Sequence, residues 1–362
     1  MGFRDYYRQF DDIDEAKLNL ERRARRRQEK AAALERAPEI DLSGTEWPDL
    51  PHSEVVNAAI ARARGYVQRY PDRHATATRR LLAERHGLEP DQIVLGNGAA
   101  DLLHSAALAL LSEGDELVMP WPSYPLYPLL AAHAGATPIS ADESDIAAAV
   151  TPRTRVLVLC NPNDPTGTYY RSEELRELLS ALPEQVFVLL DEALIHFQDV
   201  EEMDACLRLV DDFERLLVVR TFSKIYGLSG LRAGYAVGSD ARLLAASAPV
   251  LGVNALTQAA VEHALRNGDA EIERRRHSVA RERQVLTEQL RELGVDVSDS
   301  QANFLWIRVR ELSGDQLANG LREQGVIVAP GGPLGEDNHI RAAVRGEAAS
   351  NRLLQAISNE LR

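Results

Sequence analysis

Three short segments of this chain carry residue types that together would support chemistry on a carbonyl group. Lys224 closes the apolar run RLLVVRTFSK, and lysine is the side chain that forms a Schiff base with a carbonyl cofactor. Asp191 follows the apolar run QVFVLL, where a carboxylate could pair with a cationic ring nitrogen. The segment GNGAA at residues 96–100 opens a predicted helix, whose free N–H groups would favour a phosphate.

None of these features is specific alone, because a glycine-rich turn is usually only a turn and a lysine is usually a surface charge. Two further apolar runs are followed by polar groups. Tyr124 comes soon after one of them, and the other is followed directly by a polar turn at residues 161–167 that contains Asp164. The joint occurrence of these groups predicts a site for pyridoxal phosphate (PLP), in which a carboxylate keeps the pyridine nitrogen protonated.

The elements that must position these groups are short apolar runs that alternate with amphipathic helical segments. The runs span residues 92–96, 116–120, 155–160, 185–193 and 215–224. Strand–helix alternation of this kind predicts a mainly parallel sheet in a three-layer α/β/α domain. Ligands of such sheets bind at the carboxyl ends of the strands, which is where the candidate residues stand.

The last third of the chain has a different pattern, which predicts a smaller α+β domain. A charged helix is expected at residues 269–293, and strands are expected at residues 304–309, 326–330 and 340–344. We therefore expect a large PLP-binding domain at residues 37–248. Residues 1–36 and 249–362 would form the small domain.

The segment from Ser223 to Tyr235, SKIYGLSGLRAGY, is similar to the lysine motif of fold-type I PLP-dependent aminotransferases of class I/II. The eight-residue step from Lys224 to Arg232 matches that motif, as do the Asp-Glu-Ala element that begins 33 residues earlier and the Pro-Thr-Gly turn before it. The histidinol-phosphate aminotransferase-like subgroup is the most similar, and the resemblance runs from about residue 40 to the C-terminus.

This resemblance implies a role for each matching residue. Lys224 would bind PLP as a Schiff base and, once released by substrate, would move a substrate proton. Asp191 would hold the pyridine N–H. Thr221, Ser223 and Arg232 would bind the phosphate with the backbone N–H groups of Ala99 and Ala100, Tyr124 would stack on the ring, and Asn303 and Arg341 would bind the substrate. Tyr70 would reach the phosphate of the neighbouring subunit's cofactor, which implies a homodimer with a shared active site.

Several positions depart from the family's pattern. Asp164 and Leu194 stand where the family has asparagine and tyrosine, which both donate to the phenolic oxygen of PLP. Residues 328–330 lack the arginine that helps histidinol-phosphate aminotransferases to bind the substrate phosphate, which weakens the case for that substrate. Arg345 replaces a glycine and would either recognise an acidic substrate group or lie on the surface. His196 is a further candidate for the pocket, or a packed histidine.

The composition excludes other classes of protein. A net charge of −14 argues against nucleic-acid binding, and no apolar window approaches the length of a membrane span. Two cysteines are too few for a disulfide framework or a zinc site, so we expect a cytoplasmic protein without a metal. The basic run at residues 21–30 is flanked by acidic residues, and we interpret it as a solvated arm or a helix that packs on a partner subunit.

The sequence thus predicts an aminotransferase that moves an amino group from a small amino acid to a 2-oxo acid through pyridoxamine phosphate. Another PLP reaction on the same scaffold stays open: decarboxylation, β/γ-elimination or replacement, or cyclisation. The two lost donors at residues 164 and 194 favour that alternative. A non-catalytic PLP-binding regulator is less well supported, because the basic run is too short for a DNA-binding domain.

Overall fold

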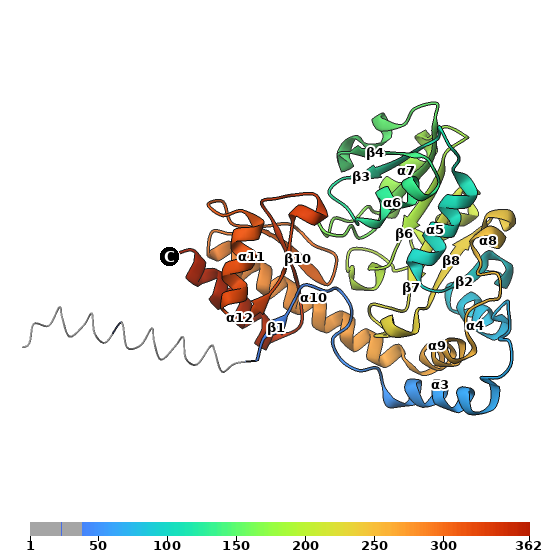
Figure 1. Ribbon diagram of the computed structural model, residues 1–362, viewed down its shortest axis with the longest axis horizontal. Helices are drawn as coiled ribbons and strands as arrows, with labels where there is room; N and C mark the ends of the chain where they lie inside the picture. Colours follow the sequence, from blue (N-terminus) through green and yellow to red (C-terminus); the bar gives the residue numbers. More distant parts are fainter. Residues whose placement is uncertain (1–22, 24–37) are drawn as a thin grey trace, which may run out of the picture.

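The computed structural model describes residue 23 and residues 38–362 of the chain. The predicted N-terminal part of the small domain and nearly all of the basic run lie outside these residues. The described chain forms a larger part around a seven-stranded sheet and a smaller part, orange and red in Figure 1, that contains the C-terminus. No helix among the described residues is long and apolar enough to span a membrane.

The central sheet has the strand order β2-β8-β7-β6-β5-β3-β4. Only β8 runs antiparallel to its neighbours, so the sheet is mainly parallel, as predicted. Its strands are β2 (Ile93–Gly96), β3 (Glu116–Pro120), β4 (Thr137–Ala141), β5 (Thr154–Cys160), β6 (Phe187–Asp191), β7 (Leu216–Thr221) and β8 (Gly234–Gly238). The five predicted apolar runs correspond to β2, β3, β5, β6 and β7, whereas β4 and β8 were not predicted.

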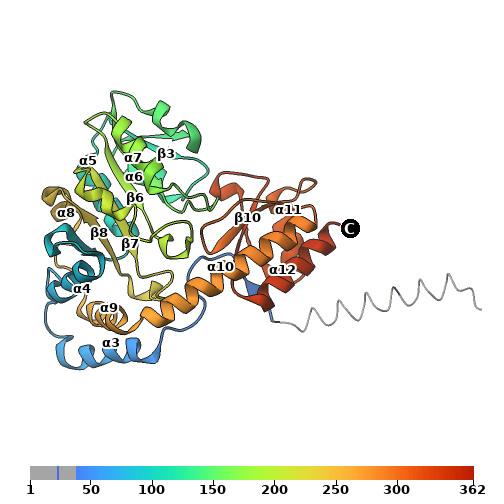
Figure 2. The ribbon, with the colours of Figure 1, turned by 180° about the vertical axis from the view of Figure 1, so that it is seen from behind.

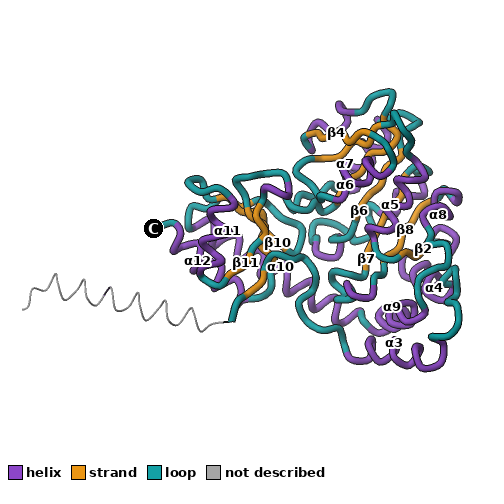
Figure 3. Tube along the Cα trace, in the orientation of Figure 1, coloured by secondary structure: helices purple, strands orange, loops and turns teal. Residues whose placement is uncertain are grey.

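Both faces of this sheet are covered by helices, which confirms the three-layer α/β/α prediction (Figure 3). One face packs on α4 (Thr76–His86), α7 (Ser172–Ala181) and α9 (Ala255–Asn267). The other face packs on α5 (Ala99–Leu110), α6 (Leu126–His133) and α8 (Ala241–Ser247). Alternate residues of β7 enter the two cores, so the whole strand is buried and apolar burial stabilises the layers from both sides.

The smaller part is an antiparallel sheet with helices packed against it, as the α+β prediction required. Its strands have the order β12-β13-β10-β9, and a separate parallel pair joins β1 to β11. These strands are β1 (Ile40–Asp41), β9 (Asp296–Val297), β10 (Phe304–Arg308), β11 (Val326–Ile327), β12 (Ala329–Pro330) and β13 (Ile340–Ala343). The helices are α10 (Asp269–Glu292), α11 (Gly314–Glu323) and α12 (Glu347–Glu360).

The long helix α10 connects the two parts (Figure 2). Ile272 and Val279 in its first half join a core of the large sheet, whereas Leu286 and Leu290 join the core of the small part. Before it, α9 packs on α3 (Ser53–Tyr66) and α4. The domain boundary at residues 248 and 249 stays a prediction, and these contacts favour a division further along the chain, within α10.

Candidate active site

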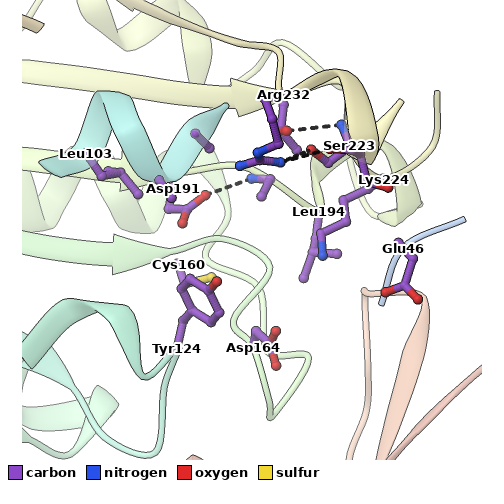
Figure 4. Close-up of a pocket in the computed structure, with 15 residues that line it drawn as sticks. Glu46, Leu103, Tyr124, Cys160, Asp164, Asp191, Leu194, Ser223, Lys224 and Arg232 are labelled. Atoms are coloured by element: carbon purple, nitrogen blue, oxygen red, sulfur yellow. Dashed lines mark hydrogen bonds between the residues drawn. The ribbon is translucent and has the colours of Figure 1, made fainter. Parts of the chain in front are cut away.

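A cavity of about 290 Å³ opens where β5, β6 and β7 end, beside the first turn of α5 (Figure 4). Nine of the twelve predicted site residues line it: Ala99, Ala100, Tyr124, Asp164, Asp191, Thr221, Ser223, Lys224 and Arg232. The remaining three, Tyr70, Asn303 and Arg341, do not. The strand-end argument therefore located the cavity, because parallel strands bring their carboxyl ends to one edge of the sheet.

Lys224 follows β7, and its Nζ donates a hydrogen bond of 2.5 Å to Oγ1 of Thr45. Burial lowers the pKa of this lysine, although the charge of Asp164 raises it, and the charge of Arg341 acts in the same direction as burial. A larger share of the amine is therefore neutral, which is the form that attacks a carbonyl carbon. Of the 41 Lys and Arg residues in the sequence, only Lys17, Lys30 and Lys224 are lysines. Arginine serves nearly everywhere else, but its guanidinium cannot replace an amine that forms Schiff bases.

Asp191 is the last residue of β6 and is only 3% exposed. The hydroxyl of Tyr127 donates to its Oδ2 and the backbone N–H of Ala193 donates to its Oδ1, both at 3.0 Å. Burial raises the pKa of Asp191 to about 6, although these donors and Lys224 lower it. A buried carboxylate with two neutral donors is suited to a cationic partner such as a protonated ring nitrogen.

The opposite end of the cavity is suited to an anion. Helix α5 begins after Gly98 without a side-chain cap, so its first N–H groups are free to bind a ligand. Arg232 lies over this turn, and its Nη1 donates to Ser223 Oγ at 3.4 Å and to the Ser229 carbonyl at 3.1 Å. A Cβ on Gly98 would lie 2.6 Å from Arg232 Nη2, and the φ of +97° is one that other residues rarely adopt, so glycine favours this approach. The lysine, the buried carboxylate and this anion cradle therefore fit the aldehyde, pyridine and phosphate groups of PLP.

Tyr124 lines the cavity, and its ring meets the ring of Tyr127 edge-on with centroids 5.8 Å apart. Its predicted stacking on the cofactor is compatible with this position. Tyr70 is 85% exposed and lies outside the cavity of its own chain. That position is compatible with a role in a neighbouring subunit, which a single chain does not test.

The two predicted substrate-binding residues do not line the cavity, but each contacts a residue that lines or borders it. Arg341 on β13 donates from Nη1 to Asp164 Oδ1 at 2.5 Å and from Nη2 to the Ser43 carbonyl at 2.8 Å. Asn303 donates from Nδ2 to the Thr45 carbonyl at 2.9 Å. The predicted carboxylate clamp is thus bound to Asp164, one of the positions at which the sequence departs from the family.

The other departures have clear positions. Leu194 is buried and gives the cavity an apolar wall where a donor was expected. His196 is a packed residue outside the cavity, edge-on to Tyr226 with ring centroids 5.5 Å apart. Arg345 is not a free surface charge, because its Nη2 donates to the Gly44 carbonyl at 3.1 Å and lies 3.5 Å from Glu46 Oε1.

Sequence reasoning missed the segment at residues 43–46, which follows β1. Its backbone carbonyls accept hydrogen bonds from Arg341, Arg345 and Asn303. Its Thr45 holds Lys224, and its Glu46 lines the cavity. The only signal in the sequence is a Thr-Glu pair soon after a short apolar stretch, which does not indicate a contact with a lysine 179 residues away.

Comparison with known proteins agrees with this site. Residues 37–357 match the family described as aminotransferase class I and II. The chain is 36% identical over 331 residues to histidinol-phosphate aminotransferase 1 of Nitrosococcus oceani, covering 89% of each chain. It is 37% identical over 303 residues to an aromatic amino acid aminotransferase of Mycobacteroides abscessus, covering 81% of this chain and 86% of that protein.

A solved structure of a mutant aspartate aminotransferase from Thermus thermophilus superposes with a TM-score of 0.79. The two chains are 25% identical, and the match covers 92% of this chain and 94% of the other. The family match spans both the large sheet and the small part, so it includes all of the elements that form the cavity. The chain belongs to the aminotransferase class I and II family, and it is a PLP-dependent aminotransferase.

Proposed function

We propose that the enzyme moves an amino group from a small amino acid to a 2-oxo acid, with PLP held on Lys224. The observation that carries this assignment is the placement of Lys224, Asp191 and Arg232 around one cavity. A buried lysine whose pKa is lowered, a buried carboxylate and an anion cradle are the three groups that PLP requires. The scarcity of lysine in the sequence supports Lys224 further.

When bound, PLP supplies an electron sink for the bonds at the substrate's Cα. Asp191 keeps the pyridine nitrogen protonated, because a buried carboxylate stabilises a cation beside it. Lys224 Nζ accepts the proton of the substrate's Cα and returns it, a role that its lowered pKa favours. Arg232 and the first N–H groups of α5 would hold the phosphate of PLP and so orient the cofactor for the lysine.

The amino donor is an amino acid without a phosphate group. Ala329 on β12 pairs with Arg341 on β13, and the segment at residues 328–330 carries no cation beside that arginine. Leu103 and Leu194 line the cavity, which suits an uncharged substrate side chain. Among the relatives, the aromatic amino acid aminotransferase is named for donors without a phosphate, whereas histidinol phosphate carries one.

The test is a half-reaction. The PLP-loaded protein is mixed with each of a panel of L-amino acids in the absence of an acceptor. At least one amino acid is expected to give stoichiometric pyridoxamine phosphate and its 2-oxo acid. Release of carbon dioxide or ammonia with PLP retained would contradict transamination and support another PLP reaction. Lys224→Ala is expected to abolish product formation.

We also propose a cytoplasmic homodimer with a shared active site. Apolar side chains that a monomer would leave in water support it: Val56, Ile60, Val67, Tyr70, Val250 and Leu251 are all exposed. Light scattering should give twice the chain mass of 40.0 kDa, and a monomer would contradict the proposal. The free and buried Cys160 and Cys206 are compatible with a reducing compartment.

Tyr70 is proposed to bind the phosphate in the partner's site. Tyr70→Phe should weaken PLP binding about tenfold, because it removes one hydrogen bond to a charged group. The control is Tyr66→Phe, since Tyr66 is also exposed but has no proposed role. Equal PLP affinities for Tyr70→Phe and the unmodified protein would exclude this contact.

A further inference from the structure

An ion pair lies in the wall of the active-site cavity. Arg341 Nη1 and Asp164 Oδ1 are 2.5 Å apart, and their side chains are only 12% and 9% exposed. The arginine comes from β13 of the small sheet, and the aspartate comes from the turn after β5 of the large sheet. Asp164 itself lines the cavity (Figure 4), whereas Arg341 does not line it and contacts Asp164.

The guanidinium of Arg341 has donors that this pair does not use. Its Nη2 donates to the Ser43 carbonyl, and its Nε is buried without a hydrogen-bond partner among the described residues. A buried donor without a partner is unfavourable, so the Nε of Arg341 favours a further acceptor beside the guanidinium. A ligand carboxylate that binds there would share the guanidinium with Asp164.

The charges of Arg341 and Asp164 determine how favourably a ligand carboxylate binds at this position. The single positive charge of Arg341 is already balanced by Asp164 in a site that is largely removed from water. A second carboxylate would therefore approach a neutral pair and would lie close to a like charge. With asparagine at this position the same contact would leave the positive charge of Arg341 for the ligand.

We propose that Asp164 is a specificity-determining residue that competes with the ligand's carboxylate for Arg341. The enzyme therefore discriminates weakly between amino donors that carry a carboxylate and otherwise identical donors that carry an alcohol in its place. Both classes of donor are accepted, and Asp164 is the residue that makes their affinities similar. This inference rests on the proposed function, because it concerns the donor's group next to Arg341.

Asp164→Asn tests this directly. Asparagine has the same shape and keeps one oxygen for Arg341, so the change removes the charge and leaves the packing. The probes are 3-phenylpropionate and 3-phenylpropan-1-ol, which differ only in the carboxylate and lack the amino group needed to react. Calorimetry on the PLP-loaded proteins gives the dissociation constant of each probe.

The acid is expected to bind Asp164→Asn about ten- to a hundredfold more tightly than the unmodified enzyme, which lies in the upper part of the range for coupling between groups in contact. The alcohol should change by less than about twofold, since it has no charge for Asp164 to repel. The double variant Asp164→Asn/Arg341→Gln should lose the gain for the acid. Asp199→Asn is the matched control, because its carboxylate pairs with Arg283 at 3.2 Å outside the cavity.

The proposal is overturned if the acid binds Asp164→Asn no more tightly, if acid and alcohol change together, or if the gain persists without Arg341. Failure of both probes to bind Asp164→Asn also overturns it. The half-reaction with amino acids is a separate measurement. A gain for the acid without transamination would leave this inference standing and refute the proposed function, and the reverse result would do the opposite.

Discussion

Replacing Asp191 with asparagine is expected to stabilise the PLP-free protein near neutral pH while it lowers turnover. The carboxyl group is 3% exposed, and burial raises its pKa to about 6 from an ordinary 3.8. Its charged form is therefore unfavourable in the folded protein unless a cation is bound. Asparagine has no charge to bury, but it also cannot keep the pyridine nitrogen of PLP protonated.

The size of the effect follows from the two pKa values. At pH values between 3.8 and about 6, the folded protein holds a proton on Asp191 that the unfolded chain has released. The free energy of unfolding therefore falls as the pH rises through this range. A difference of roughly two pH units, at about 1.4 kcal/mol per unit, amounts to about 3 kcal/mol. Asparagine loses one acceptor and so about 1 kcal/mol of hydrogen bonding, which leaves a net gain of about 2 kcal/mol above pH 6.

Urea unfolding of the PLP-free protein and of the variant, compared at each pH from about 4 to 7, measures this difference while other titrating groups cancel. The advantage of the variant should grow by about 3 kcal/mol across that range. Asp199→Asn is the matched control, because it removes a carboxylate whose side chain is 53% exposed instead of buried. A flat difference for Asp191→Asn, or a less stable variant above pH 6, would refute the reasoning.

Two further substitutions test the cradle and the buried charges behind the site. Gly98→Ala would place a Cβ 2.6 Å from Arg232 Nη2 at a φ of +97°, so a fluorescence titration should show PLP binding weakened about tenfold or more. Gly87→Ala has φ +67° with nothing within 4 Å of the added Cβ, and it should leave PLP affinity unchanged. Arg220→Met removes a fully buried guanidinium that pairs with Glu192 at 2.7 Å, which should lower the free energy of unfolding by about 3–5 kcal/mol. A loss below 1 kcal/mol in urea would show that the buried carboxylate is neutralised in another way.

The strands that carry the site were predictable because their physical setting is simple. A strand such as β7 is buried on both faces, so its sequence is a continuous apolar run that ends where the ligand binds. Edge strand β4 has no such run, because most of its residues are exposed or half-buried. Strand β8 begins and ends in glycine and starts at the last two residues of the lysine motif, so its apolar stretch is short.

The contacts that adjust the site were not predictable. Thr45 reaches Lys224, and Asp164 reaches Arg341, across sequence separations of 179 and 177 residues. Nothing in a local pattern encodes such a pairing, because it depends on how the small part packs on the large sheet. The sequence did identify Asp164 as a departure from the family and Arg341 as a predicted substrate-binding residue, but only separately. Their ion pair is what the structure adds, and our proposal that Asp164 competes for the substrate's carboxylate rests on it, while the predicted contact of Asp164 with PLP stays a prediction.

The most direct test of the central claim is the identity of the residue that holds PLP. Borohydride reduction of the PLP-loaded protein fixes the cofactor to its lysine, and peptide mass spectrometry then locates it. With only Lys17, Lys30 and Lys224 in the sequence, the assignment has three possible outcomes for a lysine. The account predicts one phosphopyridoxyl group per chain, on the peptide that contains Lys224. A label on Lys17 or Lys30, or no label at all, would contradict it.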